Sequence, residues 1–136
     1  MKYTLTSMLL ICLSLLNSDL LAQNSCQEEV VYKTSSVGNG KESLPFALMF
    51  FIKSDTLRIA NNEASAKASE NVPYLILAKT CKWNTSFTEG EAFYKLLLRD
   101  KDEVKYPTLS IEIKEKKGRI VLQYQNSEPK VFEMVL

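Results

Sequence analysis

The side chains that could do chemistry in this chain are carboxylates, lysines and cysteines, because its 136 residues include no histidine. The usual general base and the commonest zinc ligand are therefore absent. Acidic residues such as Glu91, Asp102 and Glu112 fall in expected turns or on the polar side of expected strands. No spacing pairs two of them as acid and base. We expect a protein that is not an enzyme and that needs no metal or cofactor.

The first 22 residues have the pattern of a secretory signal peptide. Lys2 supplies the positive start, Met8 to Leu16 the apolar stretch, and Ala22 the small residue before a cut at Gln23. A single-span anchor is the alternative, but the apolar stretch is shorter than the roughly 20 residues that a span needs. We expect residues 23–136 to be one exported domain, periplasmic or secreted, with no stable membrane insertion.

Of the three cysteines, Cys12 lies in the expected leader, which leaves Cys26 and Cys81. In an oxidising compartment such a pair usually forms a disulfide. The alternative is one buried free thiol and one exposed thiol near the terminus. We expect the Cys26–Cys81 bridge.

Alternation of apolar and polar residues predicts strands, most clearly in the last third of the chain. Leu109, Ile111 and Ile113 alternate with polar residues, as expected for a sheet with one dry face. A turn at Lys116 to Gly118 follows, in which glycine can supply a positive φ. The whole pattern predicts eight strands: 28–34, 45–53, 56–60, 73–83, 91–99, 107–114, 119–125 and 130–136. We expect an all-β fold, a small antiparallel up-and-down barrel or a partly open one, with a two-sheet sandwich as runner-up.

Three stretches are harder to assign. Residues 35–43 and 61–71 are expected to be loops, the second with room for one helical turn. Thr88 to Glu91 matches a helix capping box, yet residues 91–99 also alternate as a strand does. We expect a strand there.

Aromatic residues are the candidate ligand contacts. An eight-stranded barrel can be filled by side chains or hold one small ligand, and the pattern does not choose between them. The residues expected to line such a cavity are Phe50, Tyr74, Trp83, Phe87, Tyr94 and Tyr124.

The stretch from Cys81-Lys82-Trp83 through Phe87-Thr88-Glu89-Gly90 to Phe93-Tyr94-Lys95 resembles a set of small exported bacterial proteins of unknown function. The resemblance covers residues 81–136 and implies a lipocalin-like β-barrel. The Gly-x-Trp motif of true lipocalins is absent, since the only tryptophan is Trp83.

Two roles follow from these expectations. The first is carriage of a small apolar ligand inside the barrel. The second is a protein interaction role for an envelope or secreted accessory factor with a filled core, through a sheet edge or an aromatic patch. The net charge of +1 gives no basic face for nucleic acid.

Overall fold

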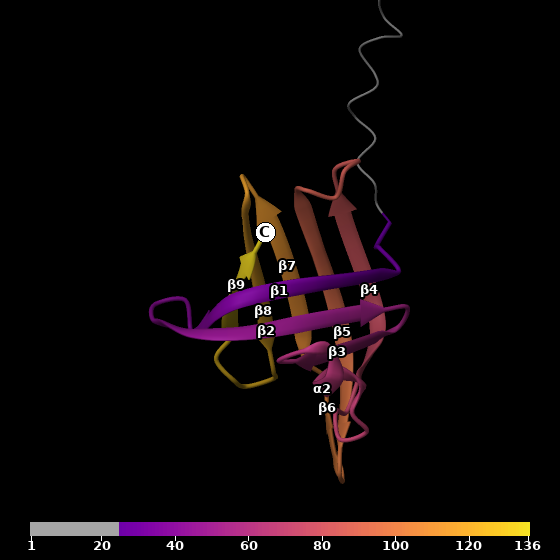
Figure 1. The fold of residues 1–136 in the computed structure, drawn as a ribbon. Helices are drawn as coiled ribbons and strands as arrows, with labels where there is room; N and C mark the ends of the chain where they lie inside the picture. Colours follow the sequence, from indigo (N-terminus) through magenta and orange to yellow (C-terminus); the bar gives the residue numbers. More distant parts are fainter. Residues whose placement is uncertain (1–24) are drawn as a thin grey trace, which may run out of the picture.

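The computed structural model describes residues 25–136, so the expected leader lies outside the described residues. Figure 1 shows the fold. Its strands are β1 (Glu29–Gly38), β2 (Ser43–Lys53), β3 (Thr56–Ala60), β4 (Tyr74–Trp83), β5 (Gly90–Asp100), β6 (Glu103–Lys105), β7 (Thr108–Lys114), β8 (Lys117–Gln123) and β9 (Lys130–Val135). One short helix, α2 (Glu63–Lys67), connects β3 to β4.

The strands pair into a single antiparallel sheet that closes on itself. The order is β4-β3-β2-β1-β9-β8-β7-β5-β6, and an additional pairing between β4 and β5 joins the two sides. All strands but β6 thus make a closed eight-stranded up-and-down barrel. Closure confirms the predicted fold class over the sandwich, whose two sheets would pack face to face without a continuous ladder.

Side-chain alternation determines what lies inside the barrel. Leu109, Ile111 and Ile113 are buried, as predicted. In the first hairpins Phe50 lies opposite Ile59, and Ile52 lies opposite Leu57. The remaining buried residues of the core are Tyr32, Ile76, Cys81, Trp83, Ala92, Tyr94, Leu96, Ile120, Leu122 and Phe132.

The barrel has one short seam. β3 meets β4 through only two residue pairs, Thr56 with Leu75 and Leu57 with Tyr74. One further backbone bond, from the Ile76 amide to the Asp55 carbonyl, extends this contact. The upper part of β4 in Figure 1 therefore rises past the end of β3 and pairs only with β5.

The predicted loop at residues 35–43 is wrong at both ends. β1 continues to Gly38 and β2 begins at Ser43, which makes the hairpin between them long. Ser36 and Gly38 resemble a loop in sequence but pair with both neighbouring strands, and Ser35 lies at an irregularity where the register of both ladders shifts. Figure 1 shows the resulting hairpin lying across the other strands and extending beyond them.

The predicted use of Gly118 in a turn is also wrong. Glu115 and Lys116 take the positive φ values between β7 and β8. Gly118 already belongs to β8, where an added Cβ would lie 2.6 Å from the Met134 sulfur. The glycine is therefore required for space against β9 and not for a turn.

The stretch 61–71 includes the predicted single helical turn. The Asn62 side chain accepts a hydrogen bond from the Ser65 amide and caps α2. Ala66 of the helix and Ala60 of β3 are both buried where the two elements meet. Across residues 25–136 we find no helix with the length and apolar character needed to traverse a bilayer.

The ambiguous stretch at residues 91–99 is a strand, as predicted. β5 pairs with β4 on one side and with β7 on the other, and its alternating residues face the inside and the outside of the barrel. Its end also pairs with β6, a three-residue strand that we did not predict.

Candidate binding site

The predicted bridge between Cys26 and Cys81 is present, with the two Cα atoms 5.2 Å apart. It ties the segment that precedes β1 to the part of β4 that β3 does not reach. Cys81 is buried, and its sulfur lies 3.8 Å from the Tyr94 hydroxyl. The bridge therefore covers the barrel interior next to its short seam.

Three of the six predicted ligand contacts lie in the packed core. Phe50, Trp83 and Tyr94 are 0%, 1% and 1% exposed, respectively. Phe50 makes an edge-to-face contact with Phe132, with ring centroids 5.1 Å apart. A side chain that lined an empty internal chamber would keep accessible surface there, and these three keep almost none.

The other three predicted contacts lie near the ends of the barrel and are partly buried against the core. The hydroxyls of Tyr74 and Tyr124 lie 2.5 Å apart at the start of β4, and the Lys105 ammonium is 6.0 Å from the Tyr124 ring centroid. Phe87 lies in the loop after β4, at the opposite end of that strand. A ten-residue strand spans about 30 Å. The six residues therefore do not form one site, and their contact with a ligand stays a prediction.

Burial affects the ionisation of the inner tyrosines. It raises the pKa of Tyr94 to about 12. It also raises the pKa of Tyr32, with a smaller contribution from nearby Tyr94. Burial and the hydrogen bond with Tyr124 raise the pKa of Tyr74. These phenols are neutral at physiological pH, and the hydroxyls of Tyr74 and Tyr94 contact Tyr124 and Cys81, respectively.

The carboxylates near lysines lie at the surface. The ion pairs are Lys53–Glu29, Lys79–Asp55, Lys82–Glu91 and Lys105–Glu103. Exposed pairs of this kind contribute little to stability. Among residues 25–136, no three Asp, Glu or Cys side chains lie close enough to hold a metal ion.

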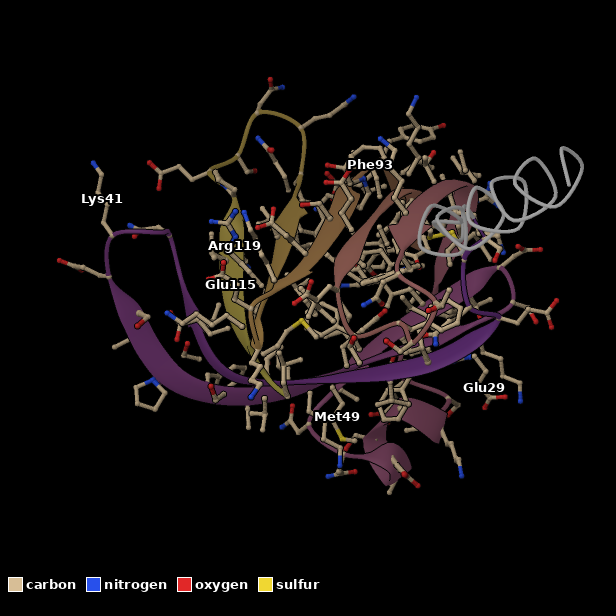
Figure 2. All side chains as sticks on the ribbon, turned by 90° about the horizontal axis from the view of Figure 1, so that it is seen from above. Glu29, Lys41, Met49, Phe93, Glu115 and Arg119 are labelled. Atoms are coloured by element: carbon tan, nitrogen blue, oxygen red, sulfur yellow. A yellow bond between two sulfur atoms is a disulfide. The ribbon has the colours of Figure 1, made fainter. Side chains whose placement is uncertain are left out.

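An apolar groove lies between the outer half of the β1–β2 hairpin and the turn that leads into β9. It has a volume of about 520 Å³. We call it the hairpin groove; its apolar lining is Val37, Leu44, Phe46, Leu48, Pro129 and Phe132. Leu44 is 71% exposed and Phe46 is 49% exposed. Figure 2 shows Lys41 at the outer end of this hairpin, away from the rest of the barrel.

The hairpin groove continues the inner face of the barrel. Val37 lies opposite Phe132 of β9 on one side and opposite Leu44 of β2 on the other. This row begins with the buried Phe132 and ends at the exposed Leu44. The barrel thus leaves part of its apolar inner surface uncovered where the hairpin extends past the other strands.

Comparisons were made with protein-family models, curated proteins and solved structures. Nothing matches. The resemblance drawn from residues 81–136 therefore stays a prediction beyond the β-barrel itself.

Sequence reasoning placed Phe46 among the aromatic residues that could line a cavity but missed Leu44, which also lines the hairpin groove. The available signal was the length of the apolar stretch from Leu44 to Ile52, compared with only five residues in the next strand, Thr56–Ala60. A strand that is longer than its partner must leave part of its edge and face uncovered.

Proposed function

We propose that this chain is an exported interaction protein, an accessory factor or inhibitor that binds a partner protein through the hairpin groove. The observation that carries this proposal is the exposure of Leu44 and Phe46 on a concave apolar surface. Apolar surface rimmed by polar residues is typical of interaction sites on soluble proteins.

The packed core supports this role over ligand carriage. Carriers need an internal or open-mouthed chamber of about 300 Å³ or more, whereas Phe50, Trp83 and Tyr94 fill the corresponding space here. Carriage inside the barrel would require these side chains to move apart. The eight-stranded up-and-down barrel is consistent with a lipocalin-like architecture, which by itself implies no activity.

Export is supported by the chemistry of the cysteines. Disulfides persist in oxidising compartments and are rare in the cytosol. The Cys26–Cys81 bridge therefore agrees with an exported location for the domain.

The test is a photo-crosslinking comparison in cells that naturally make the protein. A benzophenone amino acid replaces Phe46 in one variant and Phe93 in the other. Phe93 is the matched control, because it is 42% exposed on the outer face of β5 and does not line the groove. We expect a crosslinked partner from position 46 and none from position 93. Equal crosslinking at both positions, or none at position 46, contradicts the proposal.

A second variant tests the same surface without a label. Leu44→Lys places a charge on the groove wall, and we expect at least a tenfold loss of partner co-purification. Because Leu44 is 71% exposed, the free energy of unfolding should change by less than about 0.5 kcal/mol. Retention of the partner by a folded Leu44→Lys protein contradicts the proposed function.

A further inference from the structure

We propose that the partner enters as an extended peptide segment that adds a strand to the free edge of β2, from Ser43 to Leu48. This inference rests on the proposed function and specifies the chemistry of the partner. The added strand would lie in line with β3 and place alternate side chains in the hairpin groove.

The free edge follows from the strand pairing. β2 pairs with β1 over its whole length, from Ser43 to Lys53. Its pairing with β3 covers only Met49 to Lys53. In the described structure no strand pairs with the other side of Ser43–Leu48, and the first five of these residues are exposed. The backbone groups along such an edge are complementary to another extended backbone.

The groove beside this edge matches the side-chain period of a strand. Leu44, Phe46 and Leu48 recur at every second position and all line the hairpin groove. Alternate residues of a strand are spaced about 7 Å apart. A peptide paired with the edge would therefore present apolar side chains to this surface at the same interval. Pro129 lies on the opposite wall and would limit their depth.

The size of the edge favours a peptide segment over a second copy of the barrel. Six residues extend over about 20 Å, and a contact of that length between two barrels would fall short of the roughly 1,200 Å² expected in a stable complex. Pro45 acts against self-pairing as well, because each copy would contribute a residue without an amide donor. A single peptide strand meets only one residue without an amide donor, Pro45. The walls of the groove can enclose the peptide.

Charge around the groove selects for a segment that is apolar and not strongly charged. The charged residues nearby are Lys41 and Glu42 at the hairpin tip and Glu128 and Lys130 at the opposite wall. The two signs balance. The groove is therefore complementary to an extended peptide with apolar residues at alternate positions and little net charge.

The experiment selects binders from a displayed library of random ten-residue peptides, using the disulfide-bonded protein as bait. We expect the selected peptides to carry apolar residues at every second position. Their binding should fall at least tenfold with Leu44→Lys or Phe46→Lys and be unchanged with Leu77→Lys. Leu77 is the matched control, an exposed leucine on β4 outside the groove.

Backbone pairing is then tested by methylating single amides of a selected peptide. In an added strand, alternate amides point towards β2 and the others towards solvent. Methylation of one alternate set should reduce affinity at least tenfold, and methylation of the other set should be tolerated. Equal effects of both sets, apolar residues at helical spacing, binders insensitive to the groove variants, or failure to select any peptide would each overturn strand addition.

These outcomes separate the inference from the proposed function. If Leu44→Lys loses the cellular partner but no peptide behaves as a strand, the interaction role stands and strand addition is wrong. If Leu44→Lys keeps the cellular partner, the proposed function is wrong whatever the peptides do.

Discussion

At the scale of single residues, the groups of greatest consequence are buried and polar. The hydroxyls of Tyr32, Tyr74 and Tyr94 lie in or beside the core, where burial favours the neutral phenol. The sequence predicted that Tyr74 and Tyr94 face the barrel interior but did not indicate the hydrogen-bond partners of their hydroxyls. The closed sheet brings the Cys81 sulfur to the Tyr94 hydroxyl and the Tyr124 hydroxyl to the Tyr74 hydroxyl.

These tyrosines predict a loss of stability in alkaline solution. Burial raises the pKa of Tyr94 from 10.0 to about 12, so the folded state holds its proton more tightly than the unfolded chain does. The stabilisation is fully present below pH 10 and is lost as the pH rises from 10 to 12. Urea unfolding midpoints measured from pH 8 to pH 11 should fall above pH 10. Tyr94→Phe should reduce the fall, and Tyr106→Phe, at an exposed position, should not.

The disulfide gives a second prediction for single residues. The Cys26→Ala/Cys81→Ala double variant should lose about 2–5 kcal/mol of unfolding free energy, because the unfolded chain is no longer constrained by a 55-residue separation. Urea unfolding with and without a reducing agent measures this loss. Wild-type protein should respond to the reductant and the double variant should not. A wild-type protein that unfolds at the same urea concentration in both conditions would show that the bridge does not contribute.

At the scale of elements, strand positions were largely predictable and strand lengths were not. Alternation in residues 56–60 and 107–114 reflects local burial, and the strands lie where expected. The end of β1, the start of β2 and the short β6 depend on pairing with distant segments. Polar residues that pair in a ladder cannot be distinguished from loop residues by pattern alone, which is why the free edge of β2 was missed.

The loop between β4 and β5 provides a test of one element boundary. Gly90 has a φ of 145°, and an added Cβ would lie 2.1 Å from the Lys82 carbonyl oxygen. Gly90→Ala should therefore cost about 3 kcal/mol through backbone strain and overpacking. Gly40 is the matched control, because its φ is also positive at 89° but its nearest neighbour, Val131, is 4.0 Å away.

Gly40→Ala should consequently cost only about 1 kcal/mol, from strain alone. Chemical denaturation of both variants measures the difference. Equal losses for the two variants would show that the close approach at Gly90 does not constrain the β4–β5 loop.

At the scale of the whole molecule, the barrel combines a filled interior with an incompletely covered hairpin. The closed ladder removes most strand edges. Free edges remain on the upper part of β4, on β6 and on the outer half of β2, and the β2 edge adjoins the exposed Leu44 and Phe46. The barrel covers most of its apolar inner surface but leaves the part at the hairpin groove open. This arrangement suits the domain to binding a partner at its rim. The sequence predicted the barrel but did not distinguish a filled interior from a hollow one. Packing of the core depends on how all eight strands meet, which no local pattern records.

The filled interior predicts that a chamber appears only when a core side chain is shortened. Phe50 is fully buried against Phe132, so Phe50→Ala should cost about 3–5 kcal/mol and leave an apolar cavity. Such cavities bind benzene or xenon. Benzene should therefore raise the melting temperature of Phe50→Ala and leave the wild type and the surface control Phe93→Ala unchanged. If Phe50→Ala does not fold, Phe50→Leu provides a smaller cavity for the same measurement. Stabilisation of the wild type by benzene to the same extent would reveal an existing chamber, and the carrier role would then replace binding at the hairpin groove as the better-supported function.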